Sequence, residues 1–97
     1  MSKARIFVSR EIPQAGLKLL EEHFAIDVWP HYAPPTKQQL IDKIAGCDGM
    51  VSLLSDRIDA EVLAAAPKLK FIAQYAVGYD NIDVAEASRR GVCVSNT

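Results

Sequence analysis

The sequence predicts an α/β fold with three layers, in which a five-stranded parallel sheet lies between helices. Short segments rich in β-branched and aromatic residues alternate with amphipathic helical segments along the whole chain. Each helical segment has about ten residues, so the strands cannot pair as hairpins and must run parallel through crossovers. Several strands are almost continuously apolar, which is typical of a sheet covered on both faces. We expect a single domain over residues 1–97.

The first strand is predicted at Lys3–Val8, where apolar residues are followed at once by a polar stretch. A helix begins at Pro13, a residue favoured in the first turn, and ends near His23. Its apolar residues recur at spacings of three and four, so they form one stripe. The second strand is predicted at Ala25–Trp29.

Three prolines make Pro30–Pro35 an extended loop that cannot be helical. Thr36 and Gln39 have the spacing of a capping box, so a helix begins there, and Gly46 closes it. The apolar segment Gly49–Leu53 that follows is the third strand.

Asp59 can cap a short helix that Pro67 ends. The fourth strand is predicted at Lys70–Tyr75.

Asp83 and Glu86 form a second pair at the N-cap and third positions of a helix that runs to Arg89 or Arg90 and is closed by Gly91. Val92–Ser95 is the fifth strand. For five such alternating units we predict the strand order 2-1-3-4-5, the flavodoxin-like arrangement.

Composition excludes several classes of function. Hydrophobic residues make up 49% and charged residues 24% of the 97 residues, as in an ordinary globular protein. The net charge of −1 comes from scattered charges without a basic stripe, so we expect no nucleic-acid partner. No apolar run is long enough to cross a membrane, and we expect a cytoplasmic location. Cys47 and Cys93 lie far apart, so we predict two buried, reduced thiols and no metal site.

Candidate binding groups lie in the loops that follow the strands, because ligands of such sheets bind beyond the carboxyl ends of the strands. In the loop Ala76–Asp80, Gly78 lets the backbone approach a ligand, and successive N–H groups could bind a carboxylate. Alternatively, Gly78 only makes a tight turn.

The loop after the third strand offers Ser55, Asp56 and Arg57, which could bind a small acid or simply be solvated. His23 and His31 have no acid or nucleophile near them in the sequence, so we predict neither as a catalytic base.

A dinucleotide site would need GxGxxG after the first strand, and the sequence there is SREIPQAG. No GxxxxGK sequence occurs either. We therefore expect that these 97 residues bind no cofactor by themselves.

Two stretches, AVGYDNID and RRGVCVSNT, resemble the N-terminal region of D-isomer-specific 2-hydroxyacid dehydrogenases, and glyoxylate/hydroxypyruvate reductases in particular. The resemblance extends over essentially the whole chain. It implies a flavodoxin-like substrate-binding lobe and, in the complete enzyme, hydride transfer from NADH or NADPH to a small 2-oxo acid.

The resemblance also implies roles for particular residues. Main-chain amides of Val77 and Gly78 would hold the substrate carboxylate, and the loop Leu53, Leu54 and Ser55 would line the other side of the pocket. The catalytic Arg, Glu and His and the cofactor site of such enzymes belong to a second, nucleotide-binding lobe after the stretch that matches SNT. We therefore expect no catalytic residue within this chain and no turnover by the chain alone.

The sequence ends at Asn96 and Thr97 without a helix that could cover the fifth strand, so we expect a part of a longer polypeptide. Apolar surface left open in this way favours self-association, for example as a homodimer.

Two alternatives stay open. A phosphoacceptor receiver domain has a similar order of elements, and Glu11 and Asp56 partly meet its need for acids, but its lysine after the fifth strand is absent. A purely structural module cannot be distinguished by sequence.

Overall fold

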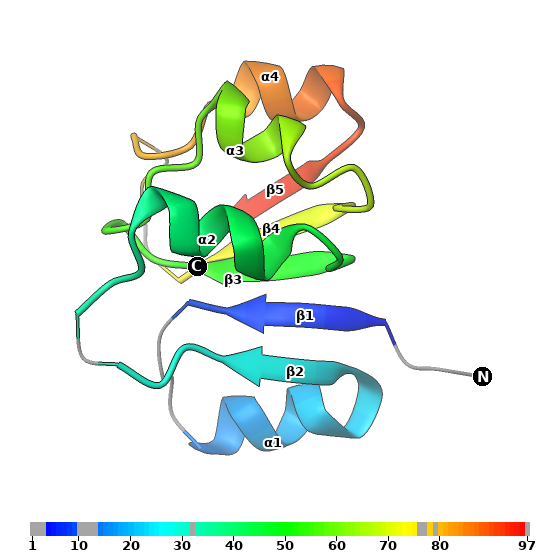
Figure 1. Cartoon of the computed structure of the whole chain (residues 1–97). Coiled ribbons are helices and arrows are strands. Elements are labelled where there is room, and N and C mark those ends of the chain that lie inside the picture. The colour runs from blue at the N-terminus through cyan, green and yellow to red at the C-terminus, as the bar shows by residue number, and fades with distance from the viewer. Residues whose placement is uncertain (1–3, 10–13, 32, 76–77, 79, 97) are drawn as a thin grey trace.

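The computed structural model describes residues 4–9, 14–31, 33–75, 78 and 80–96, with the side chain of residue 96 excepted. Its centre is one sheet of five parallel strands, in the order β2-β1-β3-β4-β5 (Figure 1). The strands are β1 (Arg5–Val8), β2 (Ala25–Val28), β3 (Gly49–Ser52), β4 (Phe71–Gln74) and β5 (Cys93–Asn96). The predicted fold class and strand order are confirmed.

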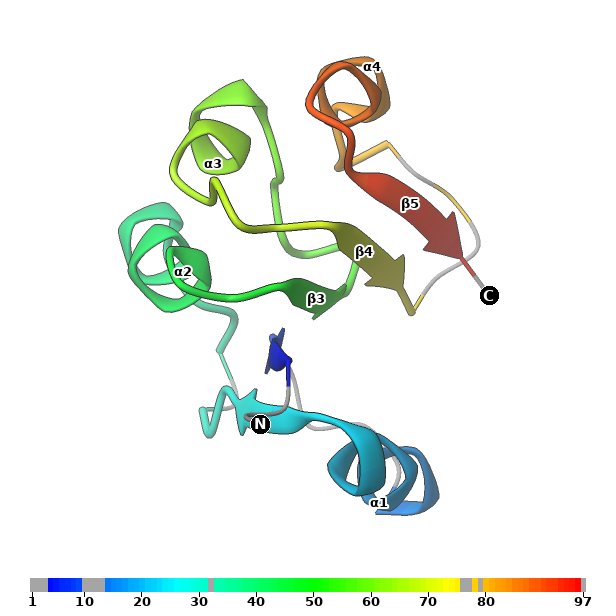
Figure 2. The same ribbon diagram turned by 90° about the vertical axis from the view of Figure 1, so that its right-hand side faces the viewer.

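Four helices connect the strands: α1 (Gln14–His23), α2 (Lys37–Ile44), α3 (Ala60–Ala64) and α4 (Val84–Arg89). Figure 2 shows α2, α3 and α4 on one face of the sheet and α1 on the other. The three predicted layers are therefore present, but the two helical layers differ greatly in extent.

The larger core lies between the sheet and the three helices α2, α3 and α4. Its members come from the strands, from these helices and from the loops between them, and the following are at most 2% exposed: Phe7, Leu40, Ile44, Met50, Ile58, Val62, Leu63, Ile72 and Ala87. At about 1.5–3 kcal/mol for each large apolar side chain, this burial is the main force that holds α2, α3 and α4 on the sheet.

A smaller core lies under α1. Leu17 of this helix packs with Ile6, Val8 and Val51 of the strands, and Phe71 borders the cluster. Because α1 contacts β2 and no helix of the described residues lies over β4 and β5 on this side, that part of the sheet stays open (Figure 2).

The predicted helix caps are present. Gln39 N–H donates to Thr36 Oγ1 over 3.2 Å and Thr36 N–H donates to Gln39 Oε1 over 2.9 Å, so the capping box is complete. Asp59 accepts from Val62 N–H and caps α3.

At α4, Asp83 accepts from Glu86 N–H, while the Glu86 side chain pairs with Arg89 and Arg90. Gly91 follows this helix with φ of 76°, the left-handed conformation expected of a closing glycine. α2 ends at Ile44 with Ala45 as its C-cap, so Gly46 follows directly as predicted, although without a positive φ.

The proline-rich segment after β2 is held by Trp29. The indole Nε1 donates to the carbonyl of Ala33 over 2.9 Å. The ring of Trp29 also meets Phe7 edge to face, with the ring centroids 6.5 Å apart. Trp29 thus ties the segment to the larger core.

The prediction of two buried thiols is half right. Both cysteines are free, and Cys47 is buried, but Cys93 is exposed. Val92 and Val94 belong to the larger core, so the residue between them points to the opposite face of β5. That face is the part of the sheet that α1 does not reach. Within the described residues, no helix has the length and apolar character needed to span a membrane.

Candidate functional site

Buried polar side chains gather where β1, β3 and β4 end. Ser9, Ser52, Asp56 and Gln74 are each at most 2% exposed, although apolar residues surround them. The carboxyl ends of parallel strands meet at one edge of a sheet, which explains why residues distant in sequence come together here. This is the edge at which the sequence predicts the site.

The amides of Gln74 and Asn81 form a reciprocal pair. Gln74 Nε2 donates to Asn81 Oδ1 over 2.6 Å, and Asn81 Nδ2 donates to Gln74 Oε1 over 3.1 Å. Gln74 Oε1 also accepts from Ser52 Oγ over 2.8 Å, and Gln74 Nε2 also donates to the carbonyl of Gly78 over 2.8 Å. Both hydrogens and both oxygen lone pairs of this buried amide are therefore used.

Asn81 connects this pair to the loop that follows β3. Its Nδ2 lies 3.0 Å from the carbonyl oxygen of Leu53 and 2.6 Å from that of Asp56, so the hydrogen that is not directed to Gln74 is shared between these two carbonyls. The main chain adds a parallel bridge between the same two loops, because Ile58 N–H donates to Asn81 O and Asp83 N–H donates to Ile58 O. The loops after β3 and β4 thus form one connected unit.

Gly78 is exposed, and among the described residues, apart from its neighbours in the chain, no heavy atom lies within 4 Å of the position that a β-carbon there would take. Gly78, one of the two residues predicted to hold the carboxylate, is therefore accessible from solvent. Val77, the other residue predicted to hold the carboxylate, lies outside the described residues.

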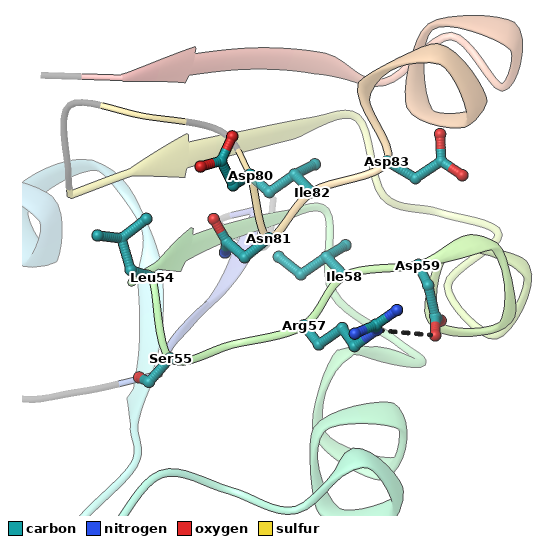
Figure 3. A pocket seen from close by; sticks show the side chains of 9 residues that line it. All are labelled: Leu54, Ser55, Arg57, Ile58, Asp59, Asp80, Asn81, Ile82 and Asp83. Atoms are coloured by element: carbon teal, nitrogen blue, oxygen red, sulfur yellow. Dashed lines mark ion pairs between the residues drawn. The ribbon is translucent and has the colours of Figure 1, made fainter.

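The predicted lining residues Leu53, Leu54 and Ser55 lie together after β3. Leu53 is partly buried and its N–H donates to Asp56 Oδ2 over 2.9 Å, whereas Leu54 is 56% exposed and Ser55 is exposed. Leu54 and Ser55 line a cleft of about 380 Å³ between the loops that follow β3 and β4 (Figure 3).

The base of this cleft is apolar, because Ile58 and Ile82 are buried, and its rim is acidic. Asp59, Asp80 and Asp83 line it with Arg57, whose Nε lies 4.0 Å from Asp59 (Figure 3). Lys37 Nζ, outside the lining, lies 2.8 Å from Asp59, so the two cations leave a smaller excess of carboxylates. This excess of carboxylates disfavours an anionic ligand inside the cleft. Gly78 is not among its lining residues.

Asp56 is neither solvated nor turned toward a ligand, which were the two possibilities considered from sequence. It is 2% exposed, and its Oδ2 accepts from Ser9 Oγ and from Leu53 N–H. Among the described residues its Oδ1 has no hydrogen-bond partner. Asp56 therefore joins the end of β1 to the loop after β3.

Neither histidine is among the described residues that form the hydrogen bonds around Gln74, Asn81 and Asp56. His23 is exposed in the last turn of α1, and His31 meets Trp29 edge to face in the proline-rich segment. Within the described parts of the chain, no three metal-binding side chains are grouped closely enough to hold an ion.

Sequence reasoning missed Gln74 and Asn81. One signal was available for each: Gln74 interrupts an apolar strand, and Asn81 follows the glycine turn. Neither signal reveals that the two amides pair.

Known proteins are similar to this chain in sequence and in fold. Residues 6–97 match the family described as D-isomer specific 2-hydroxyacid dehydrogenase, catalytic domain. A glyoxylate reductase of Korarchaeum cryptofilum is 60% identical over 95 residues, which are 98% of this chain and 29% of that protein.

Two solved structures are also similar. A protein from Pyrococcus horikoshii OT3 is 29% identical with a TM-score of 0.91, over 98% of this chain and 28% of that one. An NADPH-dependent glyoxylate/hydroxypyruvate reductase from Sinorhizobium meliloti, in complex with NADP and malonate, is 27% identical with a TM-score of 0.75, over 99% of this chain and 28% of that one. The chain thus spans less than a third of each relative, and it belongs to the D-isomer specific 2-hydroxyacid dehydrogenase family.

Proposed function

We propose that this chain is the substrate-binding lobe of an enzyme that reduces a small 2-oxo acid, such as glyoxylate, with NADH or NADPH. Its similarity to a glyoxylate reductase supports the substrate class. The observation that carries the proposal is that Gly78 is exposed while its carbonyl accepts a hydrogen bond from the buried Gln74 amide.

We propose that the carboxylate of the substrate binds to main-chain amides of Val77 and Gly78. Backbone N–H groups can bind an anion without a cationic side chain. The acidic rim of the neighbouring cleft supports the same choice, since it would repel a carboxylate placed there. Leu53, Leu54 and Ser55 would then border the substrate from the loop after β3.

The residues of this chain do not fit a dinucleotide cofactor, because its five glycines nowhere have the GxGxxG spacing. We propose that a separate nucleotide-binding lobe supplies the cofactor and the catalytic Arg, Glu and His. The chain would then contribute binding and orientation of the substrate and no group that transfers a proton or a hydride.

A chimeric enzyme tests the reaction. The 95 matched residues of the Korarchaeum cryptofilum relative are replaced by those of this chain, and oxidation of NADH and NADPH is followed with glyoxylate. We expect glyoxylate-dependent turnover by the chimera and none by the 97-residue chain alone. A folded chimera without turnover, or turnover by the pure chain, would contradict the proposal.

The substitution Gly78→Ala tests the binding turn. Among the described residues, and apart from the neighbours of Gly78 in the chain, no atom lies within 4 Å of the new methyl group, so the chain should fold without a steric clash. The added methyl group would occupy space beside the turn that a carboxylate needs, so the KM of the chimera for glyoxylate should rise severalfold. An unchanged KM would show that the carboxylate binds elsewhere.

We also propose that the isolated chain forms homodimers through the open face of β4 and β5. Cys93 and Ser95 are exposed there, beside Phe71 and Ala73 on the neighbouring strand, and β5 has a free edge. Light scattering over a wide concentration range should show dimers that Cys93→Glu abolishes. A monomer at every concentration would refute this.

The receiver alternative is not favoured, because Asp56 is buried in hydrogen bonds and the chain matches another family. The cytoplasmic location expected from the sequence stays a prediction, which fractionation of cells can test.

A further inference from the structure

The Gln74 amide is buried at the end of β4 and donates to the carbonyl of Gly78, one of the residues to which we assign the carboxylate. Only 2% of the residue is exposed, and its donors and acceptors are used by Ser52, Gly78 and Asn81. A buried amide whose hydrogen bonds are all made cannot also bind a ligand. Its effect on a ligand must therefore act through the residues that it holds.

One of these residues is Gly78. Glycine gives a ligand access to the backbone, but it also has more conformational freedom than any other residue, and binding must remove that freedom. The bond of 2.8 Å from Gln74 Nε2 to the Gly78 carbonyl restricts rotation of the glycine before any ligand arrives. A turn fixed in this way binds with a smaller entropic cost.

The second anchor is Asn81, which holds the facing loop. Its Nδ2 donates to the carbonyl groups of Leu53 and Asp56, while its Oδ1 accepts from Gln74. The two sides of the proposed binding site are therefore linked through one pair of amides, and a shift of either side would disturb the other.

We infer that Gln74 and Asn81 are positioning residues for the carboxylate site: their paired amides fix the Gly78 turn against the loop at 53–56. The inference rests on the proposed function, since it assumes that the substrate carboxylate binds at this turn.

Two nearly isosteric variants of the 97-residue chain test this. Gln74→Glu removes the donor to the Gly78 carbonyl and places a carboxylate against Asn81 Oδ1. Asn81→Asp keeps the acceptor for Gln74 and removes the donor to Leu53 and Asp56. The control is Ile44→Val, which shortens a fully buried side chain in the last turn of α2 and serves as a destabilised variant without a change in the network.

Two measurements by NMR separate positioning from stability. The first is the backbone order parameter of Gly78, which should fall from about 0.85 to below about 0.6 in Gln74→Glu. The second is the Kd for glyoxylate, obtained from shifts of the Gly78 amide signal. This Kd should rise about five- to tenfold in both variants, because the loss of one net hydrogen bond has an effect of that size. Ile44→Val should change neither quantity.

The outcomes distinguish the two proposals. If glyoxylate leaves the Gly78 signal of the unmodified chain unchanged, the carboxylate site is wrong, and the order parameter still decides whether Gln74 holds the turn. If glyoxylate binds but Gln74→Glu and Asn81→Asp behave like Ile44→Val, the positioning role is wrong and the site stands.

Discussion

Phe71 lays its ring over Gly49 on the neighbouring strand, in the space that a β-carbon at position 49 would need. The two residues are register partners in β4 and β3, and the ring also borders Phe24 and the smaller core. The glycine is thus the complement of the phenylalanine, because the missing side chain at position 49 leaves room for the ring.

Gly49→Ala should displace the Phe71 ring and lower the free energy of unfolding by about 1–3 kcal/mol, as overpacking does in other cores. Gly46→Ala is the matched control, because its new methyl group would meet only Arg5 Nη1 at an ordinary 3.6 Å. Urea unfolding of both variants measures the difference. Equal stability of the two would show that the ring moves aside without cost.

Asp56→Ala should destabilise the chain by about 1–3 kcal/mol, because it leaves the partly buried Leu53 N–H and the buried Ser9 hydroxyl without their acceptor. Asp80→Ala, at an exposed acid on the rim of the nearby cleft, should change stability by less than about 0.5 kcal/mol. Thermal unfolding compares the two. A similar midpoint for both variants would mean that Asp56 is not needed to join β1 to the loop after β3.

Stability should fall in acid partly through Asp59. A hydrogen bond from Lys37 holds the pKa of this carboxyl below its usual value, and a bond from Val62 N–H acts in the same direction. A carboxyl with a lower pKa in the folded state stabilises the fold above the pKa of the unfolded chain, and this contribution disappears as the pH falls through the folded pKa. The window therefore lies below about pH 4.

Asp59→Asn should flatten the dependence of the free energy of unfolding on pH in this window. Urea unfolding at steps of about half a pH unit, from about pH 2 to about pH 6, measures this dependence. Lys37→Met should flatten it as well, because it removes the main cause of the shift. An unchanged slope in Asp59→Asn would exclude this ion pair as a source of acid sensitivity.

The two thiols should react at very different rates with an aromatic disulfide reagent. Cys93 is exposed, whereas Cys47 is buried, and burial raises the pKa of the Cys47 thiol, which lowers the fraction of reactive thiolate. We expect one fast thiol in the folded chain, lost in Cys93→Ser, and a second only after unfolding. Two fast thiols would mean that the segment at Cys47 opens readily.

The sequence was sufficient to predict the fold because its local signals agree with one another. Alternating strands and helices of about ten residues require a parallel sheet, and caps such as Thr36 and Asp59 mark where helices begin. Strand boundaries differ from the prediction by only one or two residues within the described ranges, since hydrogen bonding frays at strand ends.

The candidate site was predicted less completely. Gly78 and the loop from Leu53 to Ser55 were found from their place after strands and from the family resemblance. The amide pair of Gln74 and Asn81 was not predicted, because its geometry depends on how two loops meet at the edge of the sheet. The exposure of Cys93 was missed for a similar reason: alternation along a strand does not tell which face lacks a helix.

Trp29 is the single tryptophan of the sequence, and it sits at the end of β2 with its indole bonded to Ala33 and its ring against Phe7. Its fluorescence therefore comes from one place only, the junction between the proline-rich segment and the larger core. Undocking of that segment would expose the indole to water and shift the emission to longer wavelength, even while the sheet stays intact. The chain thus carries its own optical probe, which can distinguish local opening from global unfolding without any added label.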